Sequence, residues 1–195
     1  MNSKGIKTTI IMVVMVALIL GYYLYLSNRN SASTSAEAAQ QQTSQEMTAV
    51  QSLIARADYK EYPATPVQVL KYYNEITSCF YNEVYSQDEL NALARLASSL
   101  YDEELATNQS FEDYISALKD DIAVFKNGNM TIYDSQVTPA TDVVYFSHNG
   151  YECAKLYCTY TLKSGTVYQA SREVFILRKD TEGHWKILGF DLVEE

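Results

Sequence analysis

The sequence predicts an α+β domain, in which three helices pack on one antiparallel sheet, preceded by an N-terminal transmembrane helix. Three observations predict this arrangement. An uncharged apolar run stands near the N-terminus, apolar residues then recur at helical spacing as far as Gly128, and from Met130 onward they alternate with the period of a strand. Because no helical pattern separates the strand-like segments, neighbouring strands are expected to pair as antiparallel hairpins.

Residues 10–26, IIMVVMVALILGYYLYL, contain no charged side chain, and two preceding threonines extend the run to 19 residues. As a helix such a run spans roughly 26–29 Å, close to the hydrocarbon thickness of a bilayer. It exceeds the usual apolar core of a cleaved leader, and its three terminal tyrosines suit the headgroup region. We therefore predict an uncleaved transmembrane helix at residues 8–27, with the lipid bilayer as its partner. Cleavage within residues 36–38, where small side chains lie, is the alternative.

The charges beside this run predict its orientation. Lys4 and Lys7 precede it, and only Arg29 follows closely. Positive residues stay on the cytoplasmic side of a membrane. Residues 1–7 are therefore predicted to form a cytoplasmic tail of a single-pass protein in the cell membrane, with the C-terminal domain extracytoplasmic.

Residues 28–62 are predicted to form a flexible stalk. Between residues 30 and 46 nothing apolar is larger than alanine, so this segment cannot bury much surface. A weak helical pattern at residues 47–57 either extends the stalk or lies on the domain. Pro63 then marks the entry to the extracytoplasmic α+β domain, which we place at residues 63–195.

Each of the three predicted helices has a start signal. Residues 65–68, TPVQ, form a capping box with proline at the first helical position. Residues 86–89, SQDE, form a second box, and Ser110 can cap a third helix that ends at Gly128. The acidic residues at 102–104, between the second and third helices, are expected to form a solvated face.

Five strands are expected after the helices, separated by turns at residues 148–150, 163–165 and 181–183. Trp185 is expected to fill the core between sheet and helices. Cys79 and Cys158 are interpreted as small buried apolar residues, since three scattered cysteines do not form a disulfide framework. The predicted strands are 130–137, 142–147, 151–162, 167–179 and 184–193.

Charge and residue types exclude several functions. All 24 acidic residues lie after residue 30, against 12 of the 15 basic ones, which gives that segment a formal charge of −12. Such a surface repels nucleic acid, so no nucleic-acid partner is expected. With two histidines and no zinc-type spacing, the sequence predicts no metal and no cofactor.

Two segments carry a resemblance to a known family. The closing hairpin at residues 172–195, REVFILRKDTEGHWKILGFDLVEE, resembles the ending of the nuclear-transport-factor-2-like (SnoaL-like, cystatin-like) superfamily. Residues 62–83, YPATPVQVLKYYNEITSCFYNE, resemble uncharacterised membrane-anchored proteins of Gram-positive bacteria built on the same plan. The resemblance covers residues 63–195 and implies a cone-shaped α+β fold. It does not imply one activity, because this fold hosts enzymes, binders and assembly parts alike.

The enzymes of that superfamily place a carboxylate base and Tyr or His donors inside the cone. No such motif matches here residue by residue, so no catalytic residue is assigned. Asp191 and Arg172 lie on long predicted strands, and a buried carboxylate with a raised pKa can act as a base. The alternative is that Asp191 is solvated near the chain end and Arg172 is paired on the sheet face. The 17 tyrosines either serve as half-buried packing or line a pocket or docking face. The pocket candidates are Tyr72, Tyr157, Tyr160, Tyr168, Arg172 and Asp191.

The function favoured by these observations is a non-catalytic binding or assembly module at the cell envelope, with a protein or envelope ligand as its partner. A component of a type IV secretion or conjugation-like assembly is a concrete version. The alternative is a small-molecule binder or enzyme that uses the cavity of the cone. A cavity lined by polar groups that include Arg172 or Asp191 would favour the alternative. A filled cone with an exposed apolar sheet face would favour the module.

Overall fold

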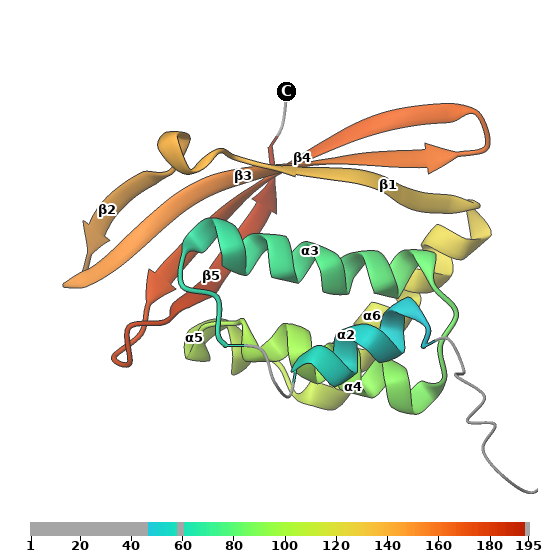
Figure 1. Cartoon of the computed structure of the whole chain (residues 1–195), viewed down its shortest axis with the longest axis horizontal. Helices are drawn as coiled ribbons and strands as arrows, with labels where there is room; N and C mark the ends of the chain where they lie inside the picture. Colours follow the sequence, from blue (N-terminus) through green and yellow to red (C-terminus); the bar gives the residue numbers. More distant parts are fainter. Residues whose placement is uncertain (1–46, 58–60, 194–195) are drawn as a thin grey trace, which may run out of the picture. The chain divides into compact units, whose positions relative to one another are not determined.

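The computed structural model describes residues 47–57 and 61–193, and residues 46–195 form one compact unit. Helices α2 (Ala49–Ala57), α3 (Pro66–Asn82), α4 (Gln87–Ser99), α5 (Glu103–Ala106) and α6 (Phe111–Asn127) precede all the strands. The helices gather on one face of the sheet, and α3 lies along it (Figure 1). The predicted α+β class is confirmed.

The predicted tail, transmembrane helix and most of the stalk lie outside the described residues. Within residues 47–57 and 61–193, no helix is long and apolar enough to cross a bilayer. The transmembrane helix at residues 8–27 therefore stays a prediction.

The five strands form one antiparallel sheet. They are β1 (Met130–Val137), β2 (Val144–His148), β3 (Tyr151–Ser164), β4 (Val167–Lys179) and β5 (Trp185–Leu192). The order is β1-β3-β4-β5, and β2 pairs with the first part of β3. The strand predicted from Asp142 begins at Val144 instead, because a short 3-10 turn, Ala140–Asp142, follows Pro139 and ends with Asp142 N–H donating to the Pro139 carbonyl at 2.9 Å.

The predicted helix starts are present, and one start and one end differ in detail from the prediction. Thr65 accepts from the Gln68 N–H at 3.2 Å, but the Gln68 side chain accepts from Ala64 rather than from Thr65. Ser86 and Glu89 form the full reciprocal capping box. Helix α6 ends at Gly128 as predicted, although Asn129, at φ 47°, takes the left-handed conformation.

Helix α2 packs on the domain. Val50 is 0% exposed and Leu53 is 4% exposed, and both belong to the hydrophobic core. On its exposed side the Gln51 amide donates to the Glu89 carboxylate of α4 at 3.0 Å. The sequence left open whether residues 47–57 extend the stalk or lie on the domain. The structure shows that they lie on the domain, so the packed unit begins before the predicted Pro63.

The core lies between the helices and the inner face of the sheet. Alternate residues of β3 point inward, so Leu156, Cys158 and Tyr160 are buried, and Phe175 does the same on β4. Trp185 is 7% exposed, as expected for a core residue. All three cysteines are free and buried, which confirms the interpretation of Cys158 and of Cys79 on α3 as small core residues.

The prediction of a solvated face at residues 102–104 holds for Glu103 and Glu104, which are exposed, and is wrong at Asp102. Its side chain caps α5 by accepting from the Glu104 N–H at 3.0 Å, and it also accepts from the Arg178 Nε at 2.9 Å. Asp102 is only 4% exposed. Arg178 lies far away in the sequence, on β4, so local pattern could not indicate this ion pair.

Candidate functional site

The main candidate site is a cavity of about 440 Å³ between α3, α6 and the inner face of the sheet. Residues from β1, β3, β4 and β5 form its sheet wall, and the loops before and after α5 contribute Tyr101 and Gln109. Eight of its 17 lining residues are aromatic. The aromatic lining residues are Tyr73, Phe80, Tyr81, Tyr101, Tyr114, Phe125, Tyr160 and Phe190.

Four of the aromatic rings form a connected set. Tyr73 contacts Tyr101 and Phe190 at ring-centroid distances of 6.0 and 6.3 Å, and Tyr101 contacts Tyr114 at 6.1 Å. The Tyr73 and Tyr101 hydroxyl oxygens are 3.4 Å apart. These residues come from α3, the α4–α5 loop, α6 and β5, so the wall depends on the tertiary fold.

A hydrogen-bond chain orients Tyr160. Its hydroxyl donates to Asn74 Oδ1 at 2.7 Å, and Asn74 Nδ2 contacts Cys158 Sγ at 3.2 Å. Asn74 is 4% exposed, so its amide needs these partners inside the protein. These hydrogen bonds hold the Tyr160 ring in the cavity wall.

The charged residues of the wall are both acidic. Glu173 pairs with Cys158 across β3 and β4, which turns its carboxylate to the inner face, and Asp121 of α6 lies exposed on the wall. None of the described residues lining the cavity is Lys, Arg or His. Burial raises the pKa of Glu173 above its usual value.

The tyrosine hydroxyls stay protonated at neutral pH. Burial, together with the nearby Asp121 carboxylate, raises the pKa of Tyr81 to about 12. Burial also raises the pKa values of Tyr73, Tyr101, Tyr114 and Tyr160. The wall therefore offers neutral rings and hydroxyl groups, together with one half-buried carboxyl group.

The structure does not bring the six predicted pocket residues together. Tyr160 lies in the cavity, whereas Tyr72 lines a smaller hollow with Tyr62 and Pro63. The other four lie on the sheet face that the helices leave uncovered. There the Arg172 guanidinium lies over the Tyr157 ring at 4.4 Å, Tyr168 contacts Tyr133 at 5.2 Å, and Asp191 is exposed.

Sequence reasoning missed Glu173, although a signal for it was present. Glu173, Phe175 and Leu177 alternate along β4, and the last two are apolar, which places the glutamate on the core face. Tyr73, Tyr101 and Tyr114 are partly buried and pack against the core. Their meeting around one cavity depends on helix placement, which spacing alone does not give.

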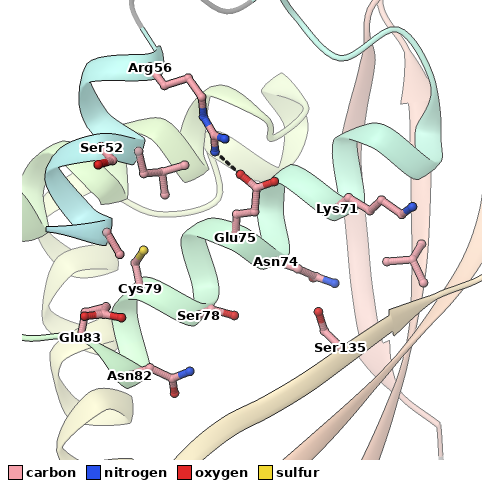
Figure 2. Close-up of a pocket in the computed structure, with 13 residues that line it drawn as sticks. Ser52, Arg56, Lys71, Asn74, Glu75, Ser78, Cys79, Asn82, Glu83 and Ser135 are labelled. Atoms are coloured by element: carbon pink, nitrogen blue, oxygen red, sulfur yellow. Dashed lines mark hydrogen bonds and ion pairs between the residues drawn. The ribbon is translucent and has the colours of Figure 1, made fainter. Parts of the chain in front are cut away.

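A second hollow, of about 500 Å³, lies between α2, α3 and β1 (Figure 2). Its charges are mixed and mutually compensated, with Arg56 ion-paired to Glu75. Asn82 closes one end by bonding both backbone groups of Ile132, donating at 2.7 Å and accepting at 2.8 Å. Its side chains thus serve mainly to join α2 and α3 and to hold the edge strand.

One group of side chains has the composition of a metal site. Asp180, Glu182 and His184, in the β4–β5 turn, offer ligand atoms within 4.8 Å of one another. The turn itself explains their closeness, because Asp180 accepts from the backbone N–H groups of Glu182 and His184 at 2.9 and 2.8 Å. His184 also packs against the Tyr62 ring at 4.6 Å.

Fold and site together define a small α+β domain with an aromatic, acidic cavity between its helices and its sheet. The chain belongs to the domain family of unknown function DUF6715, whose model matches residues 1–190. No curated protein matches the chain.

A structural match is a mutant of the helical cell shape determining protein Pgp2 from Campylobacter jejuni, with 13% sequence identity and a TM-score of 0.34. The match covers 64% of this chain, which spans 40% of that structure. Similarity at this level defines neither the fold nor the function.

Proposed function

We propose that the chain is a single-pass, membrane-anchored binding protein whose folded unit takes a small ligand in the aromatic cavity. The observation that carries the proposal is the cavity itself. Its volume of about 440 Å³ falls within the range of roughly 300–1,000 Å³ typical of ligand pockets. Such pockets combine apolar walls with a few polar groups, and here tyrosine hydroxyls and Glu173 supply those groups.

The cavity shifts the balance between the two functions expected from the sequence. Arg172 and Asp191, which would have favoured a cavity function, lie outside it. Five tyrosines and a carboxyl group nevertheless make its wall partly polar, so ligand binding is the better supported function. The role assigned to these groups is orientation of a bound molecule, and the protein is proposed as a binder rather than an enzyme.

The proposal also includes the location and the finer fold. The uncharged run at residues 8–27 would anchor the protein, with the domain outside the cell. The finer fold is a cone-shaped, nuclear-transport-factor-2-like arrangement. Support for it comes from helices gathered on one face of a sheet with long β3 and β4 strands (Figure 1).

A neutral apolar dye, N-phenyl-1-naphthylamine, tests the cavity as a binding site. Its fluorescence is expected to rise with the native protein and to stay low with Ala117→Phe, because Ala117 lines the cavity and the larger side chain occupies it. The matched control is Ala123→Phe, since Ala123 is exposed on the same helix and lines no part of the cavity. Equal dye binding by both variants would contradict the proposal.

A second candidate function is docking of a protein on the uncovered face of the sheet, as part of an envelope assembly. Tyr133 and Tyr168 favour it, because they form a ring pair there while remaining 64% and 52% exposed. A photoreactive residue at position 168 is expected to give one discrete adduct in intact cells, and the same residue at the exposed Val84 none. Absence of an adduct at position 168 would argue against docking.

A further inference from the structure

We infer that the ligand of the aromatic cavity is a small organic cation, an ammonium compound. This inference rests on the proposed function and specifies the ligand class of the same site. Three properties of the wall lead to it: the sign of its charges, an unpaired carboxylate, and tyrosine rings over which no described lysine or arginine lies.

The charges of the wall are of one sign. Glu173 and Asp121 are acidic, and no described lining residue is Lys, Arg or His. The chain as a whole carries a formal charge of −9, which attracts cations and repels anions at long range. An anionic ligand would meet two like charges in the cavity, whereas a cation would meet two opposite ones.

Glu173 has no partner of its own. No hydrogen bond or ion pair connects its half-buried carboxylate to any other described residue. Asp102, by contrast, is paired with Arg178. A carboxylate withdrawn from water is costly unless a positive group or a donor faces it, and a bound ammonium would supply that group.

The tyrosines inside and outside the cavity differ in their partners. Lysine or arginine lies over several outer rings; Arg172, for example, is 4.4 Å from the Tyr157 ring, and Lys186 is 4.3 Å from the Tyr62 ring. The other tyrosines with such partners are Tyr85, Tyr133, Tyr151 and Tyr168. Over the part of the chain that the structure describes, no Lys or Arg lies over the five cavity tyrosines.

Ring faces carry partial negative charge and attract cations most strongly where water is excluded. Burial raises the pKa of every cavity tyrosine, so the rings remain neutral. An alkylated ammonium group needs apolar contact and a counter-charge together. The cavity offers both, because it combines rings from several elements with one carboxylate.

Isothermal titration of the full chain in a non-ionic detergent tests this inference. The probes are choline and its uncharged carbon isostere, 3,3-dimethylbutan-1-ol, which differ in charge but hardly in shape. Choline is expected to bind roughly tenfold more tightly or better, the difference that a desolvated cation–aromatic contact provides. Glycerophosphocholine is titrated as well, because binding of it without choline would assign the ammonium to a lipid headgroup rather than to a free molecule.

Two variants separate the local carboxylate from general charge. Glu173→Gln is expected to remove most of the preference for choline over the isostere. Glu112→Gln removes the same charge from an exposed position of α6 outside the cavity and is expected to leave the preference intact.

The possible results distinguish this inference from the proposed function. Equal binding of choline and the isostere, or binding of the isostere alone, overturns the cation inference and leaves the binding function standing. Binding of the naphthylamine dye without choline, glycerophosphocholine or the isostere has the same meaning. Failure of all four ligands to bind overturns both.

Discussion

Replacing Val50 tests whether α2 belongs to the folded unit rather than to the stalk. Val50 is 0% exposed in the core, whereas Val124, on α6, is 62% exposed. The substitutions Val50→Ala and Val124→Ala therefore make the same chemical change on two helices, one buried and one in water. Val124→Ala is the matched control.

The expected magnitude follows from burial. Removing two buried carbon atoms at position 50 costs about 1.6 kcal/mol of transfer free energy, since each buried methylene contributes about 0.8 kcal/mol. The cavity left behind adds up to about 1 kcal/mol. Both variants regain up to about 0.6 kcal/mol because alanine favours helix more than valine. We expect the free energies of unfolding of the two variants to differ by roughly 2 kcal/mol.

Urea unfolding of a fragment comprising residues 46–195, followed by circular dichroism, measures this difference. A difference of that size corresponds to a Tm gap of about 4–8 °C for a domain of this length. If Val50→Ala and Val124→Ala agree within about 0.5 kcal/mol, α2 is not packed on the core. The unit would then begin at Pro63, as the sequence predicted.

The remaining predictions concern the cavity, the ion pair and the anchor. Glu173→Gln is expected to stabilise the domain at neutral pH. Burial raises the folded-state pKa of Glu173, so the contribution of this glutamate to stability falls as pH rises through that pKa. The difference from wild type in thermal unfolding should close as pH falls toward about 4.3, the usual glutamate pKa, and a difference independent of pH would contradict this cause. Asp102→Ala is expected to cost about 2 kcal/mol or more, because it removes a helix cap and leaves Arg178 without its buried partner; Glu103→Ala, at an exposed neighbouring position, should cost less than about 0.5 kcal/mol by the same urea assay. Protease treatment of intact cells should release the domain, and full protection would refute the extracytoplasmic topology.

Local sequence signals predicted the elements well. Thr65, Ser86 and Ser110 cap the three long helices at the predicted positions because a cap depends on residues within one turn. The Asn149-Gly150 turn was equally readable, since both residues adopt positive φ, at 51° and 83°. The helix α5 was missed because its four residues are too few to show a helical period, although its cap, in which the Asp102 side chain accepts from the Glu104 N–H, is local.

The sequence predicted the candidate site less well than it predicted the fold. Alternation along β4 marks Glu173 as inward-facing, but the sequence contains other inward residues of similar pattern, and nothing local tells which of them border an empty space. Asp191 and Arg172 were chosen by analogy with a family plan. In the structure both lie on strand positions that face away from the helices.

The sequence by itself determined the order of elements, the α+β class and the face that each helix and strand turns toward the core. These properties follow from hydrophobic period and capping, which act over a few residues. Only the tertiary structure decided that Val50 completes the core, that Asp102 meets Arg178, and that five tyrosines and Glu173 line one cavity. Those contacts depend on how helices and sheet pack across long sequence separations, where side-chain volume and shape leave the cavity open.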